Sequence, residues 1–120
     1  MERRWRLLAG VSCAAALWAS VVQAEQTPRS GDTGTGLLDA CEARDVAQHA
    51  YCLGYIGGIA DVVLTGGLRS PITACIPSSV TNAQILDITV EYLHDHPREV
   101  RSYSGAVLVL EALRKAFRCR

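Results

Sequence analysis

The cysteines are the side chains of this protein whose chemistry is easiest to define. Five occur among the 120 residues. Cys13 lies in an apolar N-terminal segment, and the other four are Cys41, Cys52, Cys75 and Cys119. Neither a C-x-x-C pair nor a Cys/His cluster indicates zinc, and an even number of cysteines in a short exported chain favours disulfides over catalytic thiols. We therefore predict two disulfides and no metal site.

The other polar side chains form no recognisable catalytic motif. The sequence contains no G-x-S-x-G, H-E-x-x-H or nucleotide-binding glycine pattern. His94 and His96 could suggest a metal site, but they stand beside Pro97 without a third ligand nearby, so we expect a solvated turn. Asp61 lies among apolar residues, where a structural hydrogen bond is favoured over acid–base catalysis because spacing places no partner group beside it. We predict no catalytic residue and no cofactor.

Three glycines, Gly54, Gly57 and Gly58, interrupt a helical pattern. They do not follow a strand, so they do not indicate a phosphate-binding loop. Each glycine inside a helix costs up to about 1 kcal/mol relative to alanine. Because Gly54 and Gly58 are four residues apart, they form a flat strip, and we predict that this strip packs closely against another helix.

The first 24 residues have the three parts of a secretory signal peptide. A basic segment, 1–6, precedes an apolar stretch, 7–22, and Val22-Gln23-Ala24 supplies small residues at the cleavage positions. A membrane-spanning helix needs about 20 residues, and the apolar stretch is shorter. The alternative to a cleaved signal is an uncleaved membrane anchor. We predict cleavage after residue 24, a periplasmic mature chain of 96 residues and no membrane association once the signal is removed.

The mature part has the composition of one small globular domain. It carries nine basic and eleven acidic residues, and this net charge of −2 excludes nucleic-acid binding through bulk positive charge. Residues 25–36 are polar and contain three glycines and a proline, so we expect a flexible tether. Residues 37–120 then form the folded domain.

Helical periodicity dominates the first half of that domain. A short helical turn is expected over 37–42, started by Thr35. The first main helix is predicted to begin at Asp45, a favourable N-cap, and to end at Leu64. Thr65-Gly66-Gly67 then stops it, because glycine adopts the left-handed cap conformation readily.

Two further helices are predicted in the second half. Thr81 and Gln84 form a capping box in front of a helix that runs to about Asp95. Pro97 suits the first turn of a third helix that continues to about Phe117. Its expected apolar stripe follows helical spacing and consists of Val100, Tyr103, Val107, Leu110 and Phe117.

These elements predict an all-α fold, a small bundle of three main helices and a short N-terminal turn, stapled by two disulfides. Short links between helices favour antiparallel neighbours, so the second and third helices would form a hairpin closed at 94–98. This arrangement would gather the four cysteines at one end of the bundle. Because the hydrophobic core of so small a domain is limited, each disulfide would add about 2–4 kcal/mol to its stability.

The predicted pairing is Cys52 with Cys75 and Cys41 with Cys119, although Cys75 with Cys119 fits almost as well. Cys41 and Cys52 would be about 16 Å apart within one continuous helix, whereas a disulfide needs about 5.5 Å between the Cα atoms. A break in the helix near Arg44 would remove that objection.

The segment 51–61, YCLGYIGGIAD, matches the pattern YC-x-GY-x-x-G-x-x-D at Tyr51, Gly54, Tyr55, Gly58 and Asp61. Further motifs are the CIP sequence at 75–77, V-T-x-x-Q at 80–84, V-x-Y-L-x-x-H-P at 90–97 and A-L-x-x-A-F-x-C at 112–119. In this order they resemble the Rap/Tai family of periplasmic immunity proteins, which act against type VI secretion amidases. The resemblance spans 41–119 with all four cysteines in register.

The resemblance implies a small helical, disulfide-bonded periplasmic protein that is often dimeric. It would bind a peptidoglycan amidase effector, a cysteine–histidine hydrolase, and obstruct its active-site cleft without catalysing a reaction. The partner contacts are expected first in two connectors, the hairpin tip at 94–98 and the loop at 66–70. The candidate residues are His94, Asp95, His96, Arg98, Gly66 and Arg69.

Two other functions remain open at this point. A small periplasmic stress chaperone or binding protein without a cognate toxin would also be helical and disulfide-bonded, and it would open and become promiscuous in acid. An enzyme would need a cleft with perturbed ionisable groups.

Overall fold

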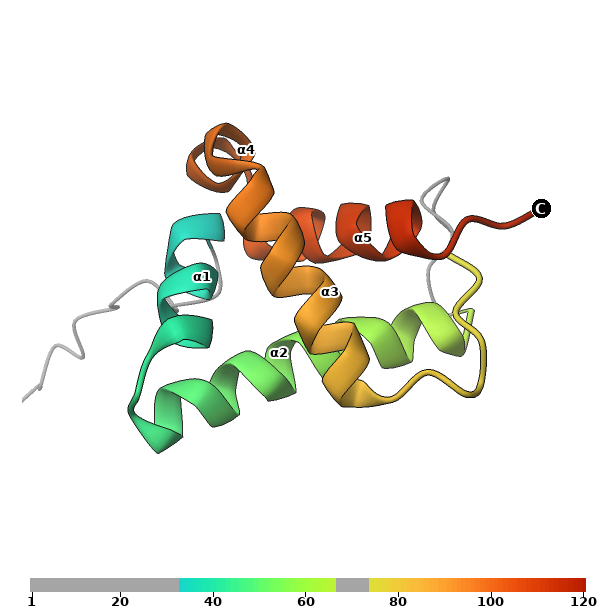
Figure 1. Ribbon diagram of the computed structural model, residues 1–120, viewed down its shortest axis with the longest axis horizontal. Coiled ribbons are helices and arrows are strands. Elements are labelled where there is room, and N and C mark those ends of the chain that lie inside the picture. The colour runs from blue at the N-terminus through green and yellow to red at the C-terminus, as the bar shows by residue number, and fades with distance from the viewer. Residues whose placement is uncertain (1–32, 67–73) are drawn as a thin grey trace, which may run out of the picture.

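The computed structural model describes residues 33–66 and 74–120, and all of the regular structure in these residues is helical. The all-α fold predicted from the sequence is confirmed. The predicted signal peptide, 1–24, lies outside the described residues. Five helices follow one another along the chain (Figure 1): α1 (Gly34–Glu42), α2 (Val46–Leu64), α3 (Asn82–Asp95), α4 (Pro97–Ser102) and α5 (Gly105–Ala116).

Helix α1 begins earlier than the sequence pattern indicated. Thr33, and not Thr35, is its N-cap, because the Thr33 side chain accepts a hydrogen bond from the N–H of Gly36 at 3.0 Å. Residues 34–36, which composition assigned to the tether, therefore form the first turn of a nine-residue helix. Gly34 at this turn is buried, and its N–H donates to the carbonyl of Tyr103 at 3.0 Å.

Helices α2 and α3 begin and end where the capping signals placed them. Asp45 caps α2 by accepting a hydrogen bond from the N–H of Gln48 at 3.0 Å. Gly66 terminates this helix with a φ of 68°, which is the left-handed conformation that favours glycine. The capping box of α3 is complete: the Thr81 hydroxyl accepts from the N–H of Gln84 at 3.3 Å, and the Gln84 side chain accepts from the N–H of Thr81 at 2.9 Å.

The single third helix predicted over 97–117 is wrong, because the chain breaks at Tyr103 and Ser104 into α4 and α5. Tyr103 has an extended backbone, with φ −116° and ψ 160°, and Ser104 starts α5 by accepting a hydrogen bond from the N–H of Val107. The break shifts the phase of the apolar stripe. Tyr103 and Val107, expected in the core, are exposed, whereas Leu108 is buried.

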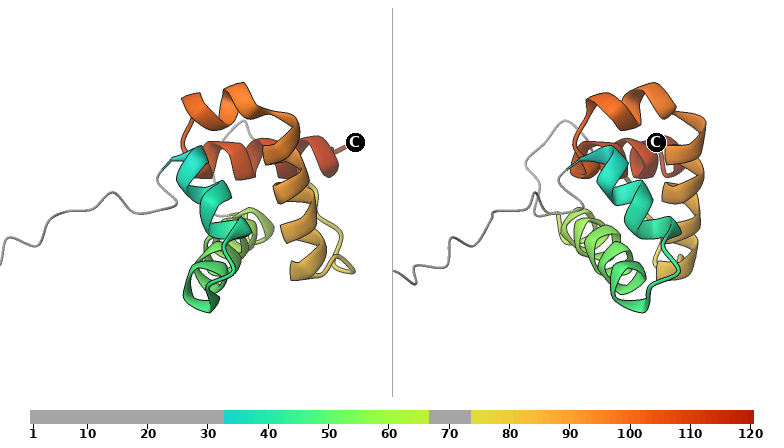
Figure 2. Two further views of the ribbon diagram at one scale, coloured as in Figure 1. Left: turned by 60° about the vertical axis from the view of Figure 1, so that its left-hand side comes forward. Right: turned by 90° about the vertical axis from the view of Figure 1, so that its left-hand side faces the viewer.

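Helices α1, α2, α3 and α5 enclose the core, and α4 covers one end of it. Helix α4 packs on α1, α3 and α5 but makes no contact with α2, and Figure 2 shows it lying across the end of the bundle remote from α2. Thr89 is the polar residue of this core, and its hydroxyl donates to the carbonyl of Ile85 at 2.8 Å. The largest fully buried apolar side chains are Leu37, Ile56, Ile85, Leu93, Leu108, Val109 and Leu113.

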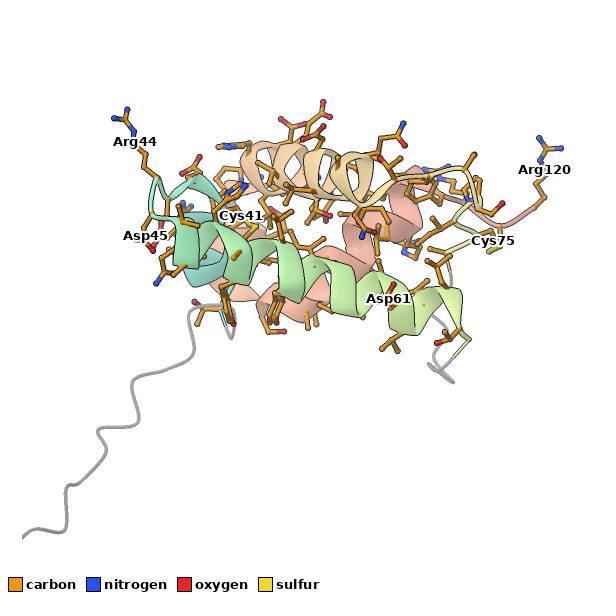
Figure 3. All side chains as sticks on the ribbon, turned by 90° about the horizontal axis from the view of Figure 1, so that it is seen from below. Cys41, Arg44, Asp45, Asp61, Cys75 and Arg120 are labelled. Carbon is orange, nitrogen blue, oxygen red and sulfur yellow. A yellow bond between two sulfur atoms is a disulfide. The ribbon has the colours of Figure 1, made fainter. Side chains whose placement is uncertain are left out.

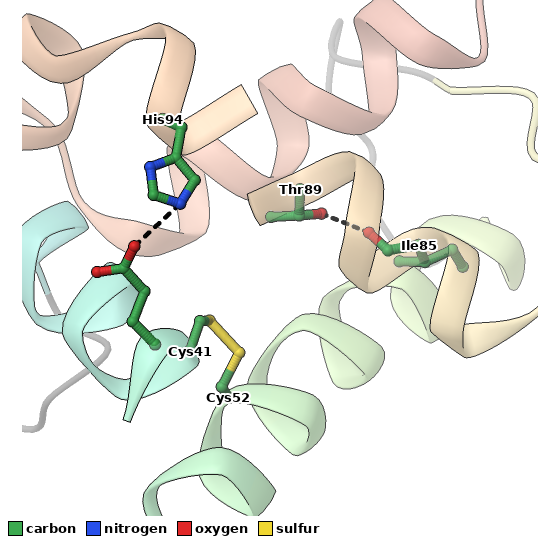
Figure 4. The surroundings of a disulfide bond; sticks show 6 residues. Cys41, Cys52, Ile85, Thr89 and His94 are labelled. Carbon is green, nitrogen blue, oxygen red and sulfur yellow. Dashed lines mark hydrogen bonds and ion pairs between the residues drawn. A yellow bond between two sulfur atoms is a disulfide. The ribbon is translucent and has the colours of Figure 1, made fainter. Parts of the chain in front are cut away.

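The two disulfides join Cys41 to Cys52 and Cys75 to Cys119, so the predicted pairs of Cys52 with Cys75 and Cys41 with Cys119 are wrong. Cys41 and Cys52 do not share one helix. The backbone turns away at Ala43, with ψ 139°, and brings their Cα atoms to 5.0 Å (Figure 4). The break expected to permit this pair is therefore present.

The cysteines are also not gathered at one end. Cys41 and Cys75 lie at opposite ends of the folded domain in Figure 3. The first disulfide fixes α1 on α2, and the second fixes the segment before α3 on the residues after α5. A backbone hydrogen bond from Cys75 N–H to the carbonyl of Phe117, 2.8 Å long, supports the second connection.

Candidate partner-binding site

Two histidines link the turn between α3 and α4, which the sequence nominated for partner contact, to neighbouring helices. The Nε2 of His94 lies 3.0 Å from a carboxylate oxygen of Glu42 on α1, a contact that is an ion pair when the imidazole is protonated (Figure 4). Both side chains are about half exposed, so the pair contributes little to stability and mainly fixes orientation. This contact ties the end of α3 to α1 and leaves Asp95 and Arg98 exposed.

His96 occupies the turn itself and is not the freely solvated residue that was expected. Its ring stacks on Tyr92, with 3.9 Å between ring centroids. Its Nδ1 lies 2.8 Å from the carbonyl of Tyr92, and its Nε2 lies 3.2 Å from Nζ of Lys115 on α5. Since a carbonyl only accepts, Nδ1 carries the proton, and Nε2 accepts from the lysine ammonium. The turn is therefore anchored to α5.

A concave site opens beside this turn, between α3, α4 and α5. It has a volume of about 320 Å³. Its two acidic side chains, Glu99 and Glu111, come from different helices. Tyr103 also lines the site, and 55% of its surface is exposed. The full lining consists of Tyr92, Glu99, Tyr103, Val107, Leu108, Glu111 and Lys115.

Charged side chains of both signs, Glu99, Glu111 and Lys115, line this pocket. Burial raises the pKa of the Tyr92 phenol, and the negative charges of Glu111 and Glu99 raise it further, while Arg114 acts in the opposite direction. Glu111 already accepts two hydrogen bonds from Arg114, at 3.2 Å from Nε and 2.7 Å from Nη2. The Glu111–Arg114 pair is partly exposed, and the pKa of the guanidinium is raised by its hydrogen bond to Glu111.

The outer face of α2 is a second candidate surface, and here the expected packing of the glycines is wrong. A Cβ atom built on Gly54, Gly57 or Gly58 would have nothing within 4 Å, so no other helix covers this strip within the described structure. Leu53 and Val62, each 41% exposed, lie on the same helix. Asp61 is the sole charged side chain of α2. The face is thus flat, apolar and poor in charge.

The signature residues on α2 divide between core and surface. Tyr51 and Tyr55 are partly buried against the core, and their ring centroids are 5.9 Å apart. Gly54, Gly58 and Asp61 are exposed. Asp61 lies near the end of α2 (Figure 3), and the structural hydrogen bond predicted for its side chain is not found among residues 33–66 and 74–120. Its carbonyl accepts hydrogen bonds from Thr65.

The nominated contact residues do not form one surface. His94, Asp95, His96 and Arg98 share the α3–α4 turn, but Gly66 follows the end of α2, which lies away from α4 (Figure 1). Arg69 lies outside the described residues. Within the part of the chain that the structure describes, no group of three His, Cys, Asp or Glu could hold a metal ion, and no helix is long and apolar enough to cross a membrane.

A family model described as Rap1a immunity proteins matches residues 33–119. The chain belongs to the Rap1a immunity protein family. The match starts at the N-cap of α1 and ends at Cys119, so it includes all five helices and both disulfides of the described structure. The family assignment made from sequence motifs is confirmed. No curated protein and no solved structure matches the chain.

For a member of the Rap1a immunity protein family, the surfaces of interest are those that could contact another protein. The sequence did not predict Glu99, Tyr103 and Val107 as pocket residues. Tyr103 and Val107 were expected in the core. The signal that could have found them was Ser104-Gly105, a favourable N-cap followed by a residue with poor helix propensity, in the middle of the predicted helix.

Proposed function

We propose that this protein is a periplasmic immunity protein that binds a peptidoglycan amidase delivered by type VI secretion and blocks its active-site cleft. The observation that carries the proposal is the family match over 33–119. The name of that family refers to immunity, and immunity requires recognition of a toxic effector. The motif resemblance, at Tyr51 to Asp61 and in the cysteine register, supports an amidase as the effector.

The periplasm is supported by two properties of the chain. Two disulfides are typical of proteins in an oxidising compartment and rare in the cytosol. The first 24 residues have the pattern of a cleavable export signal. A peptidoglycan amidase would also act in this compartment, so the inhibitor and its target would meet there.

Steric obstruction is the mechanism that the α3–α4 turn supports. Asp95 and Arg98 are exposed on it, while His94 and His96 hold the turn on α1 and α5. A preorganised turn loses little conformational entropy on binding, which favours a tight complex. Inserted into a cleft, the turn would exclude the peptide substrate, and the inhibitor itself would catalyse nothing.

Self-association through α2 is a companion proposal. The uncovered strip at Gly54 and Gly58 would allow two copies of α2 to approach closely about a two-fold axis, with Asp61 as the single charged side chain that each helix contributes. Gly58→Leu should then convert a dimer to a monomer in light scattering. Asp87→Leu adds the same side chain at an exposed position on α3 and should leave the dimer intact.

The proposed function is tested with cell-wall hydrolases encoded beside this gene. The mature oxidised protein should form a stoichiometric complex with one of them and abolish its release of peptidoglycan fragments. Failure to bind or inhibit any of these hydrolases would contradict immunity. Binding to many unfolded proteins without preference, strengthened by acid, would instead favour a periplasmic chaperone.

A further inference from the structure

The pocket between α3, α4 and α5 is large enough to hold one side chain of a protein partner. Its volume, about 320 Å³, lies at the lower limit of small-molecule sites. Its mouth is formed by two residues whose apolar surface is uncovered, Tyr103 at 55% exposure and Val107 at 38%. Exposed tyrosines next to a pocket are frequent centres of protein–protein recognition.

The charge of the pocket is incompletely balanced. Glu111 is paired with Arg114. Lys115 also lines the pocket, and its ammonium is engaged by other groups, with Nζ 4.9 Å from the centroid of the Tyr92 ring and 3.2 Å from His96 Nε2. Glu99, which also lines the pocket, forms no ion pair with another of the residues that the structure describes.

Glu99 and Tyr103 together form a ridge between two hollows. A second, more open hollow of about 400 Å³ is lined by Arg98, Glu99, Ser102 and Tyr103. Glu99 and Tyr103 are one helical turn apart, and the N–H of Tyr103 donates to the carbonyl of Glu99 at 2.9 Å. Both residues line both hollows, so a side chain bound there could meet a carboxylate and an aromatic ring.

We propose that this pocket receives an arginine side chain of the partner protein, with Glu99 pairing with the guanidinium and the Tyr103 ring stacking on it. A guanidinium is planar, stays charged and donates in a fork that matches a carboxylate, and it stacks on aromatic faces. Lysine lacks the planar group and the fork. The inference rests on the proposed function for the identity of the partner, whereas the preference for a guanidinium belongs to this chain alone.

The first test is a titration of the ¹⁵N-labelled, oxidised mature protein with N-acetylarginine amide, followed by amide chemical shifts. Saturable shifts should be confined to amides of the residues that line the pocket on α3, α4 and α5 and of their immediate neighbours. N-acetylcitrulline amide, which has the same shape without the charge, should not produce them. Glu99→Gln should weaken arginine binding about fivefold, and Tyr103→Ala by a similar factor.

Glu91→Gln is the matched control, because Glu91 is an exposed carboxylate of α3 that does not line this pocket. It should bind arginine as the wild type does. Absence of shifts, equal shifts with citrulline, or unchanged binding by Glu99→Gln would each overturn the proposal. Each variant is first shown to melt within a few degrees of the wild type, and Tyr103→Phe, which keeps the ring, should retain binding.

The second test uses the cognate hydrolase. Glu99→Gln should weaken the complex about tenfold or more, because a partner charge is left without its pair, while Glu91→Gln should not. If the wild type binds no hydrolase, the proposed function fails, and the arginine titration still decides the chemistry of the pocket. If the wild type and Glu99→Gln bind the hydrolase equally, the function stands and the arginine pocket is refuted.

Discussion

Replacing exposed glycines of α2 by alanine should stabilise this protein. A Cβ atom on Gly54 or Gly58 would meet nothing within 4 Å, and both positions lie inside a helix of 19 residues. Alanine is favoured over glycine there by about 0.8–1 kcal/mol because it restricts the unfolded chain. In a domain of this size, 1 kcal/mol corresponds to about 4–8 °C in the melting temperature.

Gly34→Ala provides an internal control, since the same substitution should have the opposite effect at that position. A Cβ on Gly34 would collide with the carbonyl oxygen of Val100, which is backbone, and with the Leu108 side chain. Overpacking of this kind costs about 1–3 kcal/mol. The two classes of glycine should therefore separate by about 2–4 kcal/mol, which exceeds the error of a denaturation experiment.

The measurement is urea unfolding of the oxidised protein, at concentrations low enough that the midpoint does not depend on protein concentration. Gly54→Ala and Gly58→Ala should raise the midpoint with an unchanged slope, and Gly34→Ala should lower it. A loss of stability in Gly58→Ala would mean that α2 is covered by another part of the domain, and the description of its outer face would be refuted.

Three further predictions concern the second disulfide, the capping box of α3 and Tyr92. Cys75→Ala combined with Cys119→Ala should lower the unfolding free energy by about 4 kcal/mol, because the disulfide links residues 44 apart. A loss no larger than about 1 kcal/mol in urea unfolding would contradict this prediction. Thr81→Ala removes the capping box of α3 and should cost about 1 kcal/mol, measured in the same way; no change would refute the role of the cap. Because burial and two carboxylates raise the pKa of Tyr92 in the fold, the unfolded tyrosine loses its proton first. This contribution to stability is therefore complete below the ordinary tyrosine pKa and declines as the pH rises through the pKa of folded Tyr92. Ultraviolet titration should show that Tyr92 ionises above the ordinary tyrosine pKa.

Local signals predicted the elements that depend on nearby residues. Asp45, Gly66 and the Thr81–Gln84 capping box each satisfy backbone groups within four residues, so their effect is visible in sequence. The family resemblance was also readable, because it depends on the order of residues and not on their positions in space.

The features that the sequence did not predict depend on contacts between distant segments. The break at Tyr103 is stabilised by Gly34 of α1, which is far away in the sequence but donates its N–H to the Tyr103 carbonyl. The cysteine pairing followed from a turn at Ala43, which has no strong turn residue.

Glycine spacing alone also does not specify which side of a helix is covered. Gly54 and Gly58 suit a close helix contact and an open surface equally well in sequence. Within the described residues, Gly54 and Gly58 lie on an open surface, so the strip that was expected to pack against a helix is instead a candidate interface.

The most direct test of the central claim is the activity of the neighbouring cell-wall amidase on purified peptidoglycan, titrated with the oxidised mature protein. Hydrolysis should fall linearly and end at one protein per amidase, and the protein alone should release no fragments. An amidase that stays fully active in excess protein, or hydrolysis by the protein itself, would contradict inhibition by obstruction.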